Sequence, residues 1–439
     1  MTGKKLSRRE FLRAAAASAA GAAALSAAPA LGEGFARPPR QEQITLTVAH
    51  AWETAFMPHQ EEWDAQFMAA NPDIKLSDIN NTWGDHQTIV PTWAAAGQLP
   101  DVLYVHGSRA FPWSKEGLLI NIQSYAEADE EFDVGGIWEE ALRLYRYEGN
   151  LHAIPYDHGP VILGYNKTLF DAEGVDYPAE DWTMDDLREA ALKFTKPGEQ
   201  WGYSGYYGQI QLGNETGGAH LGPWGAALFN EKEDGLLIDS DEARAALNFW
   251  FDMMHKDHAV ANQAESDSFP GGIWLSGQVA MFGLATWGAP QMHESADFEW
   301  DVAPWPEGPA GRRTGSFGSG YGITRDSKNP DAGWRYLSAY LSVEGMEFMW
   351  GKSGRGSPAR EAAYQSYLDS EIAPEHGQYF LDALKNYAVT GRPYESVTGP
   401  QVMDVVNQNS TLLATGDITV DQFISNVMEQ TEPIFAQSS

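Results

Sequence analysis

Residues 153–170 read AIPYDHGPVILGYNKTLF, and the second half of this stretch decides the fold. Its apolar run over 161–165 is short and contains β-branched residues, which is typical of a buried strand. We expect a helix over 166–173 directly after that strand. A strand that leads straight into a helix favours an α/β fold, with helices on the faces of a sheet.

The chain before this stretch has the same alternation. Residues 44–48 read ITLTV, which predicts a strand. Trp63, Phe67 and Ala70 follow at helical spacing, and Asn71-Pro72 ends that helix. The apolar run over 102–105 predicts the next strand. The N-terminal part therefore also indicates an α/β sheet.

The chain after this stretch carries clear helix starts. Thr183 with Asp186 three residues later predicts a capping box and a helix over 184–194. Ser240 caps another expected helix, and Pro330 occupies the first position of a third. Strands are expected over 279–283 and 300–303, and a final helix from Thr419. The indoles at helical spacing are expected in the core: Trp63, Trp250 and Trp334.

The first thirty residues predict a removable export signal rather than part of the fold. A basic start precedes an Ala-rich run, and Ala28-Pro29-Ala30 fits a cleavage site. Residues 7–13 read SRREFLR, which resembles a twin-arginine signal and implies a periplasmic location. An amphipathic helix or a membrane anchor is the alternative. Residues 31–43 are expected to form a flexible leader.

The composition excludes several classes of protein. The chain has no cysteine, which rules out disulfides and thiol catalysis. Without residues 1–30, 24 basic residues remain against 60 acidic ones, a formal net charge of −36. Such a charge argues against binding to nucleic acid or anionic lipid, and favours a neutral or cationic ligand. Solubility or a salty habitat would explain it equally well.

The motifs of common enzymes and cofactor sites are missing from the sequence. Gly351-Lys352-Ser353 resembles the end of a phosphate-binding loop, but that loop requires a glycine where Met346 stands. The sequence contains neither HExxH nor GxSxG. We therefore predict no catalytic residue, no metal site and no cofactor.

Several short pieces, in order along the chain, resemble the carbohydrate-binding proteins of ABC importers, the group that includes maltose-binding protein. The resemblance covers about residues 44–430. Each piece alone is weak, and their order and spacing carry the resemblance. They are AGQLPDV at 96–102, EGLL at 116–119, IPY at 154–156, YNKTLF at 165–170, GAALFN at 225–230, GQVAM at 277–281 and GYGI at 320–323.

The resemblance implies an α/β, two-lobed periplasmic-binding-protein fold with a hinge and an interlobe ligand cleft. The lobes would be discontinuous. The N-terminal lobe would hold 44–156 plus 319–355, and the C-terminal lobe 159–316 plus 359–439. The chain would cross between lobes near 156–159, 316–320 and 355–359. Ligand that touches both lobes would stabilise a closed form, which then docks on the transporter.

A sugar offers C–H faces that suit flat aromatic rings, and hydroxyls that suit planar polar groups. Trp287 ends the run AMFGLATW, and the resemblance implies that its indole stacks on sugar. A buried core indole is the alternative. Arg109 matches a sugar-contacting arginine of the group, although the Asp and Trp that accompany it there are Ser108 and Val105 here. These two departures argue against a maltose-like ligand.

The remaining residues at the implied cleft come from loops, strand ends and crossings. Trp83 and Asp85 are expected to reach it from a loop over 80–85. The others are Trp52, Glu53, His106, Tyr156, Asp157, Trp224, Tyr321 and Arg355.

The implied partners are a small-molecule carbohydrate and the membrane permease subunits of an ABC importer, bound by a monomer. Two other hypotheses stay open. The same fold could hold a polyol, glycerol phosphate, a uronate or a polyamine. A secreted carbohydrate-active enzyme is the alternative from another class.

Overall fold

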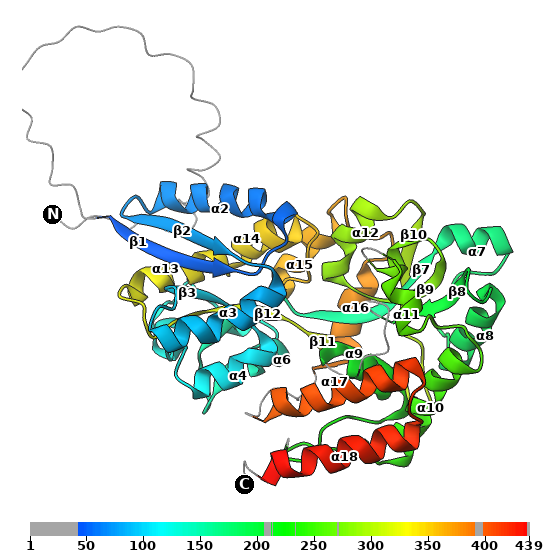
Figure 1. Cartoon of the computed structure of the whole chain (residues 1–439). Helices are drawn as coiled ribbons and strands as arrows, with labels where there is room; N and C mark the ends of the chain where they lie inside the picture. The colour runs from blue at the N-terminus through cyan, green and yellow to red at the C-terminus, as the bar shows by residue number, and fades with distance from the viewer. Residues whose placement is uncertain are drawn as a thin grey trace, which may run out of the picture. The chain divides into compact units, whose positions relative to one another are not determined.

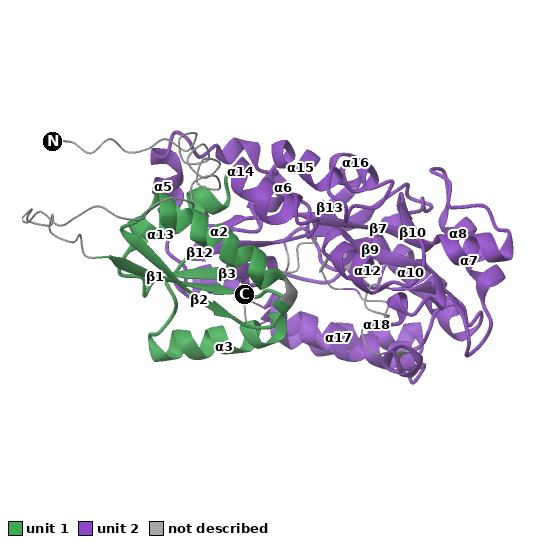
Figure 2. Cartoon of the chain, turned by 90° about the horizontal axis from the view of Figure 1, so that it is seen from above, with its two compact units in different colours: residues 1–104, 323–342 green, residues 105–322, 343–439 purple. Residues whose placement is uncertain are grey.

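The computed structural model describes residues 43–205, 212, 214–232, 234–269, 272–390 and 398–436. The predicted signal peptide over 1–30, and the predicted leader up to residue 42, lie outside the described residues. The chain divides into two compact units (Figure 2). Unit 1 holds residues up to 104 plus 323–342, and unit 2 holds 105–322 plus 343–439. The lobe boundaries implied by the resemblance differ from these units and stay a prediction.

Unit 1 is built on parallel strands in the order β2-β1-β3. Strand β1 spans Ile44–His50 and β3 spans Val102–His106, which confirms both expected strands. Strand β2, Ile74–Asn80, was not predicted. Only Ile74 and Leu76 of β2 are buried, so its sequence lacks a long alternation of apolar and polar residues.

The helices of unit 1 are η1 Thr54–Phe56, α2 Met57–Ala70, α3 Trp83–Ala96 and α13 Pro330–Tyr340. Helix α2 ends at Ala70 as expected, with Asn71 as its C-cap. The buried face of α2 packs on α13, where the ring of Phe67 lies 5.3 Å from that of Tyr336. Trp63 and Trp334 are both buried, which confirms their expected place in the core.

Unit 2 is organised around a sheet in the order β13-β11-β7-β9-β8, with β10 also paired to β7. These strands are β7 Gly159–Asn166, β8 Trp201–Ser204, β9 Val279–Ala285, β10 Trp300–Ala303, β11 Thr314–Phe317 and β13 Ala388–Thr390. Every residue of β7 is buried. Val161, Leu163 and Tyr165 enter one apolar cluster, whereas Ile162 enters a second one. This period of two places a core on each side of the strand.

Helices cover both faces of this sheet, and their starts agree with the sequence. Helix α7, Lys167–Glu173, follows β7 directly. Helix α8 spans Met184–Phe194 behind the predicted capping box, in which the Asp186 N–H donates to Thr183 Oγ1 at 3.2 Å. Helix α10, Asp241–His255, begins at its expected cap, Ser240. It buries Trp250, as expected.

A smaller part of unit 2 pairs β6, Ala153–Pro155, with β12, Ser319–Ile323, in antiparallel fashion. The two backbones lie very close together. A Cβ atom on Gly320 would lie 2.4 Å from the Ile154 carbonyl oxygen, and one on Gly318 only 2.1 Å from that of Asp157. Glycine is therefore the residue that these two positions admit.

The other elements of unit 2 connect these layers. Helices α17 and α18 run side by side at the C-terminal end (Figure 1). The elements are α4 Gly107–Lys115, α5 Gln123–Ala128, η2 Val134–Gly136, α6 Glu139–Arg143, β4 Arg146–Tyr147, β5 Asn150–Leu151, α9 Asn214–Leu221, η4 Gly222–Trp224, α11 Gln263–Asp267, η5 Ile273–Leu275, η6 Thr286–Gly288, α12 Ala289–Ser295, α14 Val343–Met346, η7 Glu347–Gly351, α15 Glu361–Leu368, α16 Gln378–Asn386, α17 Gly399–Thr415 and α18 Val420–Ala436.

Candidate functional site

In unit 1, Trp52 and Glu53 follow β1, as expected. The indole of Trp52 is only 2% exposed, and its centroid lies 5.1 Å from Phe56 and 5.9 Å from Tyr104. Asn80 fixes the same backbone, since its amide accepts from the Trp52 N–H and donates to the Trp52 carbonyl, both at 3.0 Å. The ring is thus part of the core of unit 1, while the side chain of Glu53 is exposed.

Trp83 and Asp85 lie in the first turn of α3, so the expected loop over 80–85 was wrong. Thr82 is the N-cap of this helix and its Oγ1 accepts from the Asp85 N–H at 3.2 Å. Thr82 also donates to the Asp85 carboxylate at 2.7 Å. Asp85 therefore serves the helix start, whereas the Trp83 side chain is 50% exposed.

In unit 2, His106 and Arg109 lie where β3 ends and α4 begins. His106 Nδ1 lies 2.7 Å from Ser108 Oγ, and its ring centroid lies 4.9 Å from that of Phe317. Burial, and then the nearby Arg109 guanidinium, lower the pKa of His106 to about 3. The imidazole is therefore neutral at physiological pH and can act as a hydrogen-bonding group rather than as a cation.

Tyr156 and Tyr321 are buried among aromatic rings. The ring of Tyr156 stacks on Trp350 at 4.5 Å with an interplanar angle of 12°, and lies 5.8 Å from Tyr321. Sequence reasoning missed Trp350, which comes from the π-helical turn η7, because nothing in the local sequence links it to Tyr156. The three rings are buried, with Trp350 stacked on Tyr156 and Tyr321 tilted against Tyr156 by 42°.

The three predicted crossing segments, 156–159, 316–320 and 355–359, are joined by hydrogen bonds within unit 2. The central one bonds to the second where the Tyr156 N–H donates to the Ser319 carbonyl at 2.9 Å. It bonds to the third where the Ala359 N–H donates to the Tyr156 carbonyl at 2.9 Å. The Asp157 carboxylate accepts from the Ser319 N–H at 2.6 Å. Asp157 and Arg355 are both buried at this junction.

His158 sits in the central segment and was missed as a candidate. Its Nε2 lies 3.0 Å from Ser316 Oγ and 3.1 Å from Thr390 Oγ1, and these two hydroxyls lie 3.2 Å apart. Burial, with the charge of Arg143 as the smaller cause, lowers the pKa of His158 to about 3. The sequence offered one signal for it, since His158 directly follows the predicted Tyr156-Asp157 pair.

The two remaining predicted indoles of unit 2 keep part of their surface exposed. Trp224 ends η4 and packs at 4.9 Å against Phe249. Trp287 lies in η6, and its ring covers Gly159, because a Cβ atom there would lie 2.7 Å from the indole Cζ3. Of the predicted residues, the structure thus gathers Tyr156, Asp157, Tyr321 and Arg355 at the junction of the crossing segments.

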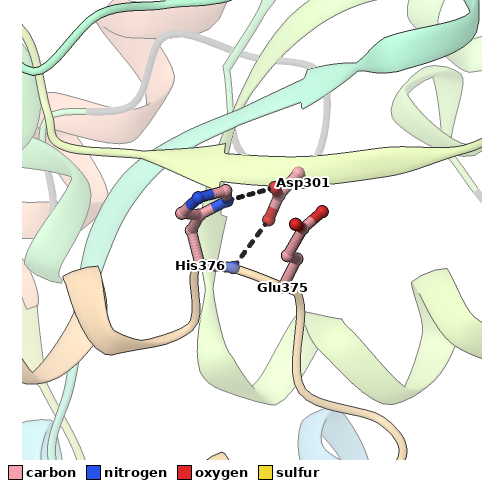
Figure 3. A group of neighbouring side chains, drawn as sticks. All are labelled: Asp301, Glu375 and His376. Carbon is pink, nitrogen blue, oxygen red and sulfur yellow. Dashed lines mark hydrogen bonds and ion pairs between the residues drawn. The ribbon is translucent and has the colours of Figure 1, made fainter.

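A group with the chemistry of metal ligands lies elsewhere in unit 2 (Figure 3). The ligand atoms of Asp301, Glu375 and His376 all lie within 4.8 Å of one another. The buried Asp301 carboxylate accepts from the His376 backbone N–H at 3.0 Å and contacts its Nδ1 at 2.6 Å. The Lys167 ammonium lies 3.2 Å from Glu375. Because these groups already occupy the carboxylates, we assign the trio to anchoring the loop before α16 and propose no metal there.

The comparisons with known proteins identify the class. The profile of bacterial extracellular solute-binding proteins matches residues 53–347, more than half of the chain, and the protein therefore belongs to that family. A Streptomyces antibioticus lipoprotein of unknown function is 24% identical over 60% of the chain. The sn-glycerol-3-phosphate-binding periplasmic protein of Shigella dysenteriae is 26% identical over 48%. The chain covers only 59% and 47% of the lengths of these two relatives.

Solved structures agree on the fold. An ABC substrate-binding protein of Listeria monocytogenes, in complex with cycloalternan, matches 90% of this chain and 99% of its own at 24% identity, with a TM-score of 0.80. The GacH receptor of Streptomyces glaucescens, studied unliganded and with acarbose, matches 89% and 98% at 20% identity, with a TM-score of 0.76. The fold is thus the α/β, two-lobed fold of periplasmic binding proteins. Within the described residues, no helix combines the length and apolarity needed to span a membrane.

Proposed function

We propose that this protein captures a sugar, mono- or oligosaccharide, in a cleft between its lobes and delivers it to the permease of an ABC importer. The observation that carries the proposal is the family match over residues 53–347. Similar chains described with cycloalternan and acarbose support a carbohydrate as the ligand. The proposed lobes are 44–156 plus 319–355 and 159–316 plus 359–439. Closure around the ligand would present one shape to the permease.

We place Trp287 as the main sugar platform. Its indole is partly exposed, as stacking on a sugar face requires. The polar contacts proposed beside it are Glu53, His106, Arg109, Asp157 and Arg355, with Trp83, Asp85 and Trp224 toward the edge of the site. Tyr156, Tyr321 and Trp52 are buried, so direct contact would require movement that exposes their rings.

A thermal-shift screen tests the ligand class. The screen would include mono- and oligosaccharides, polyols, uronates, glycerol phosphate and polyamines. A sugar at 100 times its dissociation constant should stabilise the protein by about 2.7 kcal/mol. A shift from a polyamine or a phosphate ester, with none from any sugar, would overturn the sugar assignment.

Trp287→Ala sharpens the screen at one residue. We expect the sugar-induced shift to disappear while the ligand-free melting temperature stays near that of the wild type. Trp182→Ala is a matched control, because Trp182 is a partly buried indole of unit 2 outside the proposed site. A Trp287→Ala protein that unfolds early yet still binds sugar would show that this indole is a core residue.

Glycerol phosphate is the second candidate ligand. The relative from Shigella dysenteriae binds sn-glycerol 3-phosphate, and Arg109 and Arg355 could pair with a phosphate group. Titration with sn-glycerol 3-phosphate and with neutral glycerol separates the contribution of the phosphate group to binding from that of the polyol. Binding of the ester alone, lost in Arg109→Gln, would favour this candidate.

Catalysis and export are tested separately. A binding protein returns its ligand unchanged, so chromatography of the recovered sugar should show no cleaved product. Product formation would instead support a carbohydrate-active enzyme.

We propose periplasmic export through the twin-arginine signal, and replacement of Arg8 and Arg9 by lysine should retain the protein in the cytoplasm. Sedimentation with and without sugar tests the proposed monomer.

A further inference from the structure

Thr286, the residue before the proposed sugar platform, is fully buried and bonded to a distant segment. Its Oγ1 accepts from the Ser357 backbone N–H at 3.1 Å and from the Ser357 hydroxyl at 2.9 Å. Ser357 Oγ also lies 3.2 Å from the Tyr364 hydroxyl. The chain around Trp287 is therefore fastened to the predicted third crossing segment, 355–359, through one side-chain oxygen.

Thr286 and Trp287 also pack closely against the predicted first crossing segment, 156–159. A Cβ atom on Gly159 would lie 2.9 Å from Thr286 Oγ1, and 2.7 Å from Cζ3 of the Trp287 indole. In addition, the His158 N–H donates to the Ser357 carbonyl at 3.0 Å. Thr286 thus lies at a point where the indole, Gly159 and Ser357 meet.

We propose that Thr286 is a positioning residue that holds the Trp287 indole in register with the predicted crossing segments and thereby sets the affinity of the proposed platform for sugar. This inference rests on the proposed function of Trp287 as the sugar platform. Thr286 itself does not touch the ligand. Its contribution is to fix the backbone that carries the ring, because its hydroxyl is the acceptor for two buried donors.

Three variants separate positioning from general stability. Thr286→Val keeps the shape of the side chain but removes the acceptor. Thr286→Ser keeps the acceptor and serves as the conservative control. Gly159→Ala disturbs the ring directly, because the added methyl group would overlap the indole edge and would also press on Thr286 Oγ1. The backbone φ of Gly159 is not in the left-handed region, so Gly159→Ala adds no backbone strain.

The test uses the full mature chain labelled with 5-fluorotryptophan, with the Trp287 resonance in the fluorine NMR spectrum assigned by its loss in Trp287→Phe. Without ligand, we expect Thr286→Val and Gly159→Ala to shift or broaden this resonance, and Thr286→Ser to restore it. With cycloalternan, the sugar in the Listeria monocytogenes complex, and with the strongest sugar from the screen, Thr286→Val should bind at least about fivefold more weakly, and Thr286→Ser like the wild type.

The outcomes distinguish this inference from the proposed function. A Trp287 resonance that is unchanged in Thr286→Val overturns the positioning role, whatever the ligand result. A lower melting temperature with the resonance and the sugar affinity unchanged also overturns it, since Thr286 is then only structural. If the wild-type resonance responds to no sugar, the proposed platform fails, while the ligand-free spectra still decide whether Thr286 positions the ring.

Discussion

The interiors of the two units satisfy buried polar groups in different ways. In unit 1, the buried amide of Gln60 is a hub that donates to Asp64 at 2.9 Å and to the Tyr336 hydroxyl at 3.2 Å, and accepts from Tyr340. In unit 2, His158, Ser316 and Thr390 form a triangle in which each member contacts the other two. A hub fails when its centre is removed, whereas a triangle that loses one member keeps one contact.

The two networks also respond to pH in opposite senses. Burial, and then the neighbouring Asp78 carboxylate, raise the pKa of Asp64 well above its usual range. Burial lowers the pKa of His158 to about 3. At neutral pH, Asp64 in unit 1 is therefore a protonated carboxylic acid, and His158 in unit 2 is an unprotonated imidazole. The comparison teaches that each of these two networks buries its titratable group, Asp64 or His158, in neutral form.

Of the substitutions in the two networks, Gln60→Leu should cause the largest loss in the free energy of unfolding. The substitution leaves Asp64 and two tyrosine hydroxyls without their central partner inside unit 1. At about 1–3 kcal/mol for each unsatisfied group, we expect a loss of about 3 kcal/mol or more in the free energy of unfolding, measured in urea. Gln66→Leu, on the same helix but bonded only to exposed Glu62, should change it by less than about 0.5 kcal/mol. Equal effects would contradict the hub.

The pH dependence of unit 1 comes next. A raised folded pKa means that the contribution of Asp64 is fully present below its unfolded pKa, near 3.9, and is lost as pH rises toward the folded value. Unit 1 should therefore lose up to about 1.4 kcal/mol per pH unit between pH 5 and 8. Asp64→Asn should flatten this slope, as followed by hydrogen exchange in α2. An unchanged slope would show that Asp64 is ionised in the folded protein.

Unit 2 should show the opposite slope. The folded pKa of His158 is lowered, so its contribution is present above about pH 6.5 and is lost as pH falls toward 3. His106 acts in the same direction. The protection factors of the β11 amides, which are corrected for the intrinsic pH dependence of exchange, should therefore fall below pH 6, and His158→Gln should remove part of that change. If acid leaves β11 protected in the wild type, the imidazole does take up a proton in the fold.

Thr390→Val should have the smallest effect. It removes one member of the triangle, but the contact between His158 and Ser316 remains. We expect a loss of about 1 kcal/mol in the free energy of unfolding, well below that of Gln60→Leu. Urea unfolding of the two variants side by side checks the order, and a larger loss from Thr390→Val would reverse the comparison.

Local chemistry made part of this fold predictable. The capping residues Thr183 and Ser240 placed α8 and α10 correctly, because a cap is formed within four residues. Helix α3 was missed, since it contains Pro91, which is typical of a helix break in sequence, and only His86 and Val90 of its residues are buried. A helix with so little buried surface shows no strong apolar periodicity in its sequence. For that reason the residues around Trp83 were expected to form a loop.

The candidate site was less predictable, because its contacts join residues far apart in the sequence. Nothing near Tyr156 indicates that Trp350 stacks on it, and nothing near Thr286 indicates Ser357. Sequence reasoning found strand ends and aromatic residues but could not see which of them pack on one another. Whether Trp287, Glu53 and the other predicted residues contact a ligand stays a prediction.

The close approach at Gly318 and Gly320 has a genetic consequence. Any side chain at either position would force two backbones apart, so every base change that replaces the glycine disturbs this contact, whereas a third-position change leaves it intact because all GGN codons encode glycine. In a randomised library selected for folding, both codons should continue to encode glycine. The pair would then mark, in any collection of related genes, where the two strands must touch.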